Sequence, residues 1–573
     1  MALTPGSQWS VPSAIDGLNR AQRKILFTSL KNNLVKEIEV RRLAGCAVGQ
    51  AAYDRGGKSA EGTIIGMAHD FMGSNNLNLL EPRGYFGSRY LGGLDHGKSY
   101  HIYTCLSPVT RLLFPEEDDI LLNYLECSGT SVEPIWYIPV IPMVLVNGSR
   151  GRKSKVPSYN PRDIIANLRR LLNDECVEPM DPWYRGFKGR IEKISTTVEG
   201  STYRTTGVIE VVSETKLHIT ELPIHCWTSD YRASLQSLLR WNVRDKTEEL
   251  VIEDIRLMRH DTSIKLELMF DKKNMEIVTQ EGLEKKLNLI TTVGTTNMYL
   301  LDTTGLAIRK YKNPEEILKE FFDLRLEYYG KRKKALLESL DLDLCKIANK
   351  ARFILGVTRG DINVLGRDRD DMVLELKQKG FAPLPNSSKR PGDGERVISS
   401  DYDYLLKTPV CIISPEKVNE LYAEMSKLEE KKEEVRRATP RLLWMKDLDA
   451  LEVELDRIDN AKRAQVEYME RDIRNMHSER VSERKKPAEK VSMVEIVHDK
   501  CNEVLLPEIQ PSDNVLDSTS GYTGILMHVP EKLSTAVEAD RKHQLGREEE
   551  QQKGDTGRNV RSKTGAGSSI III

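Results

Sequence analysis

The chain has 573 residues, of which 39% are hydrophobic and 30% are charged, and its net charge at pH 7 is −1. This length predicts roughly three or four domains, because one domain usually takes about 100–200 residues. The near-zero charge excludes a globally basic nucleic-acid-binding protein, but a balanced total can still contain a basic groove beside an acidic tail.

Residues 13–130 are predicted to be helices joined by short turns. The stretch GLNRAQRKILFTSL has an apolar helical pattern with a basic edge at Arg20, Arg23 and Lys24. A second helix, EVRRLAGCAVGQAAY, is rich in small residues that allow close approach. Gly and Asn are dense in GSNNLNLLEPRGYFGSR, which favours turns with positive φ and a backbone that comes close to a partner.

The next segments are predicted to be extended chain, a helix and then strands. Residues 133–148, EPIWYIPVIPMVLVNG, contain two prolines that exclude a helix interior, so we predict buried, extended chain. Asn160 and Pro161 begin an amphipathic helix. From Gly189 to about Leu222, the stretches GVIEVV and KLHITELP combine β-branched residues with period-2 alternation. We predict a second subdomain of α/β type that runs to about Lys312.

Long helices with coiled-coil spacing are predicted after residue 312. Asn313 suits a helix N-cap, Pro314 suits the first turn, and the acids that follow favour a helix N-terminus. Apolar residues then recur in steps of three and four. They are Ile317, Phe321, Leu324 and Tyr328, then Val418, Leu421, Met425 and Leu428, then Trp444, Leu448, Leu451, Leu455 and Ile458.

These helices predict an arm that leaves the body near residue 314 and returns near 458, with a small helical cap between. Thr439-Pro440 separates the last two helices, which we predict to form a hairpin. A Pro/Gly/Ser-rich stretch ends the segment 367–400, and the chain beyond about residue 478 is polar and aperiodic, as in a disordered tail.

The eight cysteines are scattered, with no CxxC pair and no Cys/His cluster of zinc-ligand spacing, so we predict reduced thiols in an intracellular protein. The sequence has no recognisable N-terminal signal and no apolar run long enough to cross a membrane. We therefore expect no membrane partner.

Several phrases occur in a fixed order along residues 11–460, and together they resemble the DNA breakage-reunion core of eukaryotic type IIA DNA topoisomerase (topoisomerase II). The phrases are DGLNRAQRKILF, RRLAG, GSNNLNLLEPRGYFGSR, TRLLFPEEDD, EPIWYIPVIPMVLVNG, FKGRIE, ITELPIHCWT, FFDLRLEYYGKRK, ANKARFI, YDYLL and LLWMKDLDALEVELD.

The resemblance implies an α+β multidomain fold with a winged-helix DNA-gate domain, an α/β tower domain and a long coiled-coil arm with a helical dimer gate. The implied boundaries are a short leader at 1–10, the DNA-gate domain at 11–148, the tower at 149–312, the arm and C-gate at 313–366 and 401–465, a linker or insert at 367–400, and a polar, largely disordered tail at 466–573.

The family passes one DNA duplex through a transient break in another. A tyrosine of the winged-helix domain attacks a phosphate and holds the broken end as a phosphotyrosine ester. An adjacent arginine and nearby histidines stabilise the developing charge, and magnesium ions held by an acidic TOPRIM cluster assist the reacting oxygens.

The catalytic strip of the family reads Arg-Tyr-Ile-Phe-Thr, and this chain aligns with it without a gap from Phe86 to Thr104. His101 then takes the position of the nucleophilic tyrosine, Tyr100 that of the arginine, and Tyr103 that of the phenylalanine. Three interpretations remain. The nucleophile is lost, which we favour; Tyr100 replaces it by a one-residue register change, which would point its side chain to the opposite face of a strand; or His101 itself attacks phosphorus.

Other departures favour loss of cleavage. Asp54 and Arg55 stand where the family carries two histidines, and an acid there would repel a phosphate. Glu39 replaces a family lysine. The loop SRGRKSK after Gly148 is shorter than the family's Gly-Ile-Gly-Thr-Gly loop and lacks its isoleucine wedge, so we expect weak or no bending of DNA.

Basic residues keep some potential to contact DNA. Arg23, Lys24 and Arg89 match family positions that face phosphate, and further basic residues near the same groove would add salt-dependent, sequence-independent affinity. These further residues are Arg41, Arg42, Arg150, Arg152, Lys153 and Lys155. A solvated surface charge is the alternative for each, and for Asn75 and Asn76 we favour a structural role in holding nearby backbone.

No ATP-binding region and no TOPRIM acidic cluster is recognisable, so we expect no cofactor in this chain, with Mg2+ and ATP belonging to other family domains. We predict a nuclear, cleavage-defective protein that binds double-stranded DNA, as a homodimer through the arm and C-gate or as a heterodimer with a full-length topoisomerase II. The alternatives are a partial enzyme that is active when ATPase and TOPRIM parts are supplied in trans, a non-catalytic dimeric DNA-binding scaffold, or a truncated gene product.

Overall fold

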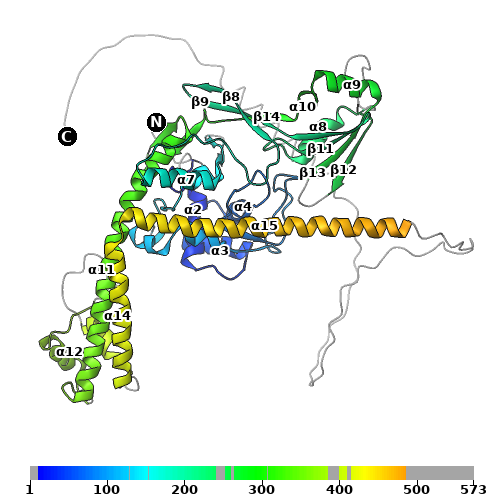
Figure 1. Ribbon diagram of the computed structural model, residues 1–573. Coiled ribbons are helices and arrows are strands. Elements are labelled where there is room, and N and C mark those ends of the chain that lie inside the picture. The colour runs from blue at the N-terminus through cyan, green and yellow to red at the C-terminus, as the bar shows by residue number, and fades with distance from the viewer. Residues whose placement is uncertain are drawn as a thin grey trace, which may run out of the picture. The chain divides into compact units, whose positions relative to one another are not determined.

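A computed structural model describes residues 11–484, apart from residues 128, 152–153, 240–251, 260–263, 306, 365, 385–398 and 410–413 (Figure 1). Three helices near the N-terminus pack on one another: α2 (Arg20–Lys31), α3 (Val40–Gln50) and α4 (Gly57–Ala68). Helix α2 begins at Asn19 with a capping box, in which the Asn19 and Gln22 side chains each accept from the other's backbone N–H.

A small antiparallel sheet adjoins these helices, with strand order β1-β3-β2. Its strands are β1 (Ile38–Glu39), β3 (Tyr103–Leu106) and β2 (Leu80–Arg83). The sequence pattern predicts helices and turns over residues 13–130, and it missed this sheet because strands of two to four residues are too short to show a period-2 alternation.

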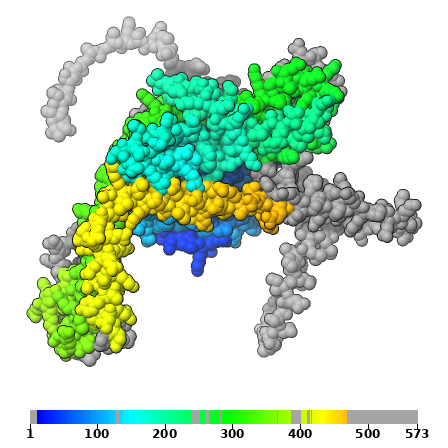
Figure 2. Space-filling view, in the orientation of Figure 1, coloured from blue at the N-terminus to red at the C-terminus, as the bar shows by residue number. Residues whose placement is uncertain are grey.

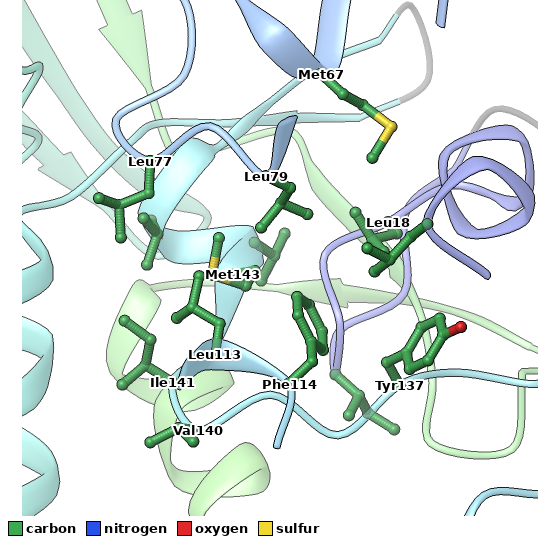
Figure 3. Close-up of a cluster of buried hydrophobic side chains, with 14 of the residues drawn as sticks. Leu18, Met67, Leu77, Leu79, Leu113, Phe114, Tyr137, Val140, Ile141 and Met143 are labelled. Carbon is green, nitrogen blue, oxygen red and sulfur yellow. The ribbon is translucent and has the colours of Figure 1, made fainter. Parts of the chain in front are cut away.

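The apolar run 133–148 lies in the main core, as its composition predicts. Strands β4 (Tyr124–Cys127) and β5 (Thr130–Pro134) form a hairpin just before it, after α5 (Pro108–Leu113) and η1 (Glu116–Leu121). The prediction of extended chain throughout was wrong at its end, because Met143–Asn147 forms the short helix α6, which begins directly after Pro142. Val140, Ile141 and Met143 pack beside Leu113 and Phe114 (Figure 3).

The segment 149–312 carries antiparallel sheets and short helices. After α7 (Pro161–Leu172), capped by Asn160 as predicted, a three-stranded sheet has the order β14-β9-β8 and a four-stranded sheet the order β10-β11-β13-β12. The strands are β8 (Arg190–Thr197), β9 (Gly200–Thr206), β10 (Val208–Ser213), β11 (Lys216–Glu221), β12 (Asp254–Arg259), β13 (Ile264–Met269) and β14 (Ile290–Gly294).

The four-stranded sheet and nearby helices enclose a separate core. Leu217 and Ile219 of β11 alternate inward with Leu266 and Leu268 of β13, and all four are fully buried. These helices are α8 (Thr228–Gln236), α9 (Lys272–Glu281) and α10 (Leu283–Lys286). Two short hairpins complete the segment. One pairs β6 (Ser149–Arg150) with β7 (Lys155–Val156), and the other pairs β15 (Met298–Leu301) with β16 (Ile308–Tyr311).

Helices α11 (Pro314–Arg359) and α14 (Pro415–Arg437) lie side by side and form an arm (Figure 1). The arm begins at Pro314 as predicted, but it ends near Arg437 rather than near residue 458. Asn313 caps α11 through a hydrogen bond from the Glu316 backbone N–H, as its sequence predicts. The segment 367–400 is more than a linker, since it contains α12 (Arg369–Gln378) and Phe381. At this end of the arm, Leu376 and Phe381 bury against Tyr402 of η2 (Ser399–Tyr402) and Leu405 of α13 (Asp403–Leu406).

Helix α15 (Pro440–Arg484) follows the break at Thr439-Pro440, but the predicted hairpin with α14 is wrong. The α15 helix packs mainly against α5, α7 and α11, and it lies along the body as a continuous ridge (Figure 2). The physical reason is its apolar face, since Trp444, Leu448, Leu451 and Leu455 all bury in the main core. The helix continues through residues 466–484, which the predicted boundaries place in the tail; residues from 485 onward lie outside the described residues.

A buried charge cluster joins η1, α11 and α15 at the base of the arm. Arg325 is 0% exposed, and its Nη2 lies 2.8 Å from Asp118 Oδ2. Arg332 and Tyr329 both donate to Asp447 Oδ2 at 2.7 Å. Burial alone would lower the pKa of Arg325, but Tyr329 and Asp118 raise it above its ordinary value. The Arg325 guanidinium therefore remains charged inside the protein.

Candidate nucleic-acid interface

The loop between β2 and β3, residues 84–102, is called the wing below, and Asp95 organises it. The Asp95 carboxylate accepts from the Ser88 backbone N–H at 2.9 Å, from Ser88 Oγ at 2.5 Å and from the Tyr85 hydroxyl. Partial burial opposes ionisation, yet these donors hold the pKa of Asp95 below its ordinary value. Gly97 N–H also donates to Tyr85 O at 2.8 Å, which closes the base of the wing.

Two glycines allow the wing to pack against the rest of the protein. Gly92 and Gly93 have φ values of +63° and +88°, which favour glycine. A Cβ at Gly92 would lie 2.4 Å from the Trp227 indole, and one at Gly93 would lie 2.4 Å from the His69 imidazole. Any larger residue would therefore push the wing away from these rings.

The predicted catalytic strip forms a turn at the end of the wing. His101 N–H donates to Lys98 O at 2.8 Å, and the ring centroids of Tyr100 and His101 are 4.4 Å apart. The Tyr100 side chain is 41% exposed and His101 is also exposed, whereas Ile102 is buried. The two candidate nucleophile positions are thus adjacent in space as well as in sequence, and both face solvent.

The strip is tied to the start of α3 through backbone hydrogen bonds. Helix α3 has no side-chain N-cap, because Glu39 makes no capping hydrogen bond. Instead, Val40 N–H donates to Ile102 O at 3.1 Å and Arg41 N–H donates to Ser99 O at 3.2 Å. The wing therefore takes the place of the missing cap, and it brings Arg41 beside Tyr100 and His101.

Arg41, Arg42 and Lys155 remain candidates for phosphate contacts because each is exposed. None of them forms an ion pair within the part of the chain that the structure describes. Arg150 is exposed on β6, with its guanidinium carbon 5.7 Å from the centre of the Trp227 ring, and neighbouring atoms lower its pKa by desolvation. Arg152 and Lys153 lie outside the described residues.

The prediction that Arg23 and Lys24 face phosphate was wrong, because both side chains are buried and paired. Arg23 Nε lies 2.7 Å from Asp16 Oδ2, and Lys24 Nζ lies 2.5 Å from Glu133 Oε2. Arg20 completes the same cluster through a 2.9 Å contact with Glu133 Oε1. The basic edge of α2 thus points toward buried carboxylates, and its charges are neutralised inside the protein.

Arg89 is likewise engaged by the protein. Its Nη1 pairs with Glu221 of β11, and its Nη2 donates to Leu222 O at 2.8 Å. Burial lowers the pKa of Arg89, while Glu221 opposes that shift. The side chain is 14% exposed, so its predicted contact with phosphate would require the ion pair to break.

Asn76 has the structural role that its sequence context favours. Its Nδ2 donates to Val146 O at 2.9 Å and, at 3.2 Å, to the carbonyls of Tyr159 and Trp183. Asn75 Nδ2 similarly donates to Gly66 O and His69 O at 2.9 Å. These amides hold backbone, and that prediction is confirmed.

Asp54 and Arg55 are both exposed just beyond α3.

A cluster of aromatic and imidazole rings beneath the wing was missed, because its members are scattered along the chain. In spatial order its rings are His69, Phe71, Trp227, His225 and Tyr184. The centroids of neighbouring rings in this order are 4.9–6.5 Å apart. Burial, Arg150 and Arg89 lower the pKa of His225 to about 3, so its ring is neutral at physiological pH. The ring cluster therefore acts as packing for the wing.

A cavity of about 330 Å3 lies between the start of α2, α4 and the loop after α6. Four apolar residues line part of it, and Figure 3 shows them as Leu18, Met67, Leu79 and Met143. Asn75, Asn147 and Arg150 also line the cavity. The Asn147 amide is already engaged with Leu77 backbone, so the polar wall is largely satisfied by the protein itself.

No group of three His, Cys, Asp or Glu side chains converges on a possible metal site in the described ranges. Among the same residues, no helix is both long enough and apolar enough to cross a membrane.

Comparisons with known proteins agree on one family. The model of the DNA gyrase/topoisomerase IV A-subunit family matches residues 9–449. DNA topoisomerase 2 of Arabidopsis thaliana is 44% identical over 490 residues, which cover 80% of this chain and 33% of the relative. Human DNA topoisomerase 2-beta is 37% identical over 481 residues, covering 80% of this chain and 29% of that protein.

A solved structure gives the same result. The Plasmodium falciparum topoisomerase II DNA-binding, cleavage and re-ligation domain superposes with a TM-score of 0.74 at 37% identity, covering 80% of this chain and 63% of that one. The chain spans about a third of the length of the curated relatives described above.

Proposed function

We propose that this chain, which belongs to the DNA gyrase/topoisomerase IV A-subunit family and corresponds to the breakage-reunion core of a type II topoisomerase, binds duplex DNA without cutting it. The observation that carries the proposal is His101, which occupies the exposed turn of the wing at the position that the family resemblance gives to the nucleophilic tyrosine. Resealing needs the broken end to be held as a stable ester, as a tyrosine hydroxyl does, whereas attack by imidazole would give a more labile phosphorus–nitrogen bond.

The surroundings of His101 support the same conclusion. Tyr100, at the position of the family arginine, brings no positive charge to a developing phosphorane. Arg23 and Arg89 are committed to Asp16 and Glu221, so they are not poised to stabilise that charge. The cations that remain exposed near this turn are Lys98, Arg41 and Arg42, and the two arginines lie on the helix that the wing caps.

Binding of duplex DNA would rest on Arg41, Arg42, Arg150 and Lys155. Each phosphate that these residues neutralise releases counterions, so affinity should fall steeply as salt rises. The buried pairs of Arg23 and Lys24 reduce the expected number of contacts, and we therefore propose modest, sequence-independent affinity. Gel shifts over a salt series would test this, and a flat salt response would contradict a phosphate-contact surface.

A plasmid cleavage and relaxation assay tests the absence of cutting. We expect this chain to give neither linear plasmid nor a covalent adduct with DNA, alone or mixed with a complete topoisomerase II, when adducts are trapped with detergent and detected through a tag on this chain. A covalent adduct on Tyr100 or His101 would overturn the proposal. It would favour the alternative of a partial enzyme supplied with ATPase and TOPRIM parts in trans.

The His101→Tyr variant separates loss of one side chain from loss of the whole site. We expect no recovery of cleavage in the mixed assay, because Asp54, Tyr100 and the shortened loop after Gly148 remain. Recovery would mean that the rest of the site is competent and that His101 alone blocks the reaction.

We also propose that the arm pairs with a second copy or with a complete topoisomerase II. Leu374 of α12 is 57% exposed at the end of the arm, beside the cluster of Leu376 and Phe381. Leu374→Glu should weaken pairing in analytical ultracentrifugation, whereas Leu442→Glu, at a 48% exposed leucine of α15, should not. A nuclear location, tested by imaging of a tagged chain, follows from the proposed duplex substrate.

A further inference from the structure

Exposed aromatic rings and cations lie close to one another along the backbone at the end of the wing and the start of α3. Tyr100 is 41% exposed and Tyr103 is 44% exposed, and neither hydroxyl has a hydrogen-bond partner among the described residues. His101 forms a tilted pair with Tyr100, with centroids 4.4 Å apart. Lys98 Nζ lies 5.8 Å from the centre of the Tyr100 ring. We call Lys98, Tyr100, His101 and Tyr103, together with Arg41 and Arg42, the ring platform.

The ring platform is held firmly enough to act as a binding surface. Tyr103 begins β3 and pairs with Glu39 of β1, while the backbone of Arg41 bonds to Ser99. The glycine contacts with Trp227 and His69 fix the other side of the wing. Exposed rings on a fixed backbone lose little conformational freedom when a ligand stacks on them.

Carboxylates near the ring platform are partly neutralised. Arg83 Nε lies 3.3 Å from Glu37 and its Nη2 lies 2.6 Å from Glu81. Glu39, which is half-buried, opposes an anionic ligand, whereas Arg41, Arg42 and Lys98 favour one. The three cations outnumber the one opposing carboxylate, and the exposed rings lie nearby. This combination fits a polyanionic ligand that also carries planar rings able to stack on tyrosine.

We propose that the ring platform binds single-stranded nucleic acid, with unpaired bases stacked on Tyr100 and Tyr103 and the sugar-phosphate backbone beside Arg41, Arg42 and Lys98. Proteins that bind single strands combine a cationic track with aromatic rings in this way. Duplex DNA hides the faces of its bases inside the helical stack, so it can use the cations of this surface but not the rings. The ring platform shares Arg41 and Arg42 with the proposed duplex-binding surface, and the two ligands differ in their dependence on the tyrosines.

Fluorescence anisotropy with a labelled oligothymidylate and a labelled blunt duplex of equal length tests the proposal on the full chain. Tyr100→Ala and Tyr103→Ala should each weaken single-strand binding by about tenfold, because each substitution removes one stacked base. Duplex binding should change by less than about twofold, within the small effect expected when phosphate contacts are kept. Tyr100→Phe should retain single-strand affinity, since the phenyl ring still stacks.

Tyr422→Ala is the matched control, because Tyr422 is 45% exposed but lies on α14 in the arm. Equal losses for both probes, or failure of phenylalanine to retain binding, would overturn the ring platform while leaving duplex binding in place. Tyrosine-dependent single-strand binding without any duplex binding would support the ring platform and overturn the proposed function. Absence of binding to either probe would overturn both.

Discussion

The buried pair of Arg325 and Asp118 makes the sharpest prediction about stability. Asp118→Ala removes the carboxylate that lies 2.8 Å from Arg325 Nη2 and leaves a guanidinium that is 0% exposed. Arg325 Nε and Nη1 already lack hydrogen-bond partners among the described residues, so no second carboxylate is in place to accept from this guanidinium. Breaking such a buried pair costs about 3–5 kcal/mol, because an uncompensated charge stays in the interior.

Trp444 provides the assay, because its indole stacks on Tyr329 with centroids 5.3 Å apart and Tyr329 in turn lies 4.2 Å from the Arg325 guanidinium. We expect the urea transition followed by tryptophan emission to shift to lower denaturant in Asp118→Ala. The double variant Asp118→Leu with Arg325→Met should recover most of the loss, since apolar replacement of both partners removes the stranded charge.

A surface pair on the same helix is the matched control. Lys331 Nζ lies 2.7 Å from Glu327 Oε1, a similar separation, but both side chains are exposed. Glu327→Ala should cost no more than about 0.5 kcal/mol, because water screens an exposed pair. If Asp118→Ala shifted the transition by no more than Glu327→Ala, the reasoning that burial sets the cost would be refuted.

Three further predictions concern the wing and its surface. The pKa of Asp95 is below its ordinary value in the folded protein, so its contribution to stability is present above the unfolded pKa and is lost as pH falls through the folded one; protection of the wing from proteolysis should drop in acid, and Asp95→Asn should remove that pH dependence. Gly93→Ala should loosen the wing and raise its hydrogen exchange, whereas Gly45→Ala on α3, where a Cβ meets open space, should be neutral or stabilising; equal effects would contradict the packing argument. The double variant Arg41→Ala with Arg42→Ala should make the salt dependence of duplex binding shallower. The negative slope of log affinity against log salt should shrink in magnitude by roughly 2, and an unchanged slope would remove both residues from the interface.

Helix starts were predictable because their signals are local. Asn160 and Asn313 each accept a backbone N–H within the first turn that follows, and Pro161 and Pro314 occupy the first helical position. The arm was predictable for the same reason, since steps of three and four residues are visible along one segment. The family resemblance supplied the α+β arrangement that these local signals could not.

The directions of the basic side chains could not be predicted, because their partners are distant in sequence. Lys24 pairs with Glu133 and Arg89 with Glu221, and nothing near Lys24 or Arg89 marks these carboxylates as partners. The face of α15 was misjudged for a related reason: coiled-coil spacing around Trp444 also suits a helix that packs on a globular core. Periodicity indicates which face is apolar but not which surface covers it.

The backbone cap of α3 has a consequence for the order in which parts of the protein fold as the chain emerges from the ribosome. The first amides of this helix find their acceptors on Ser99 and Ile102, which leave the ribosome long after Val40 and Arg41. Until that later chain arrives, the opening turn of α3 must stay bonded to water, and bringing the two segments together costs loop-closure entropy. The surface that carries Arg41 is therefore expected to be completed late in folding, when the wing folds with it as one cooperative unit.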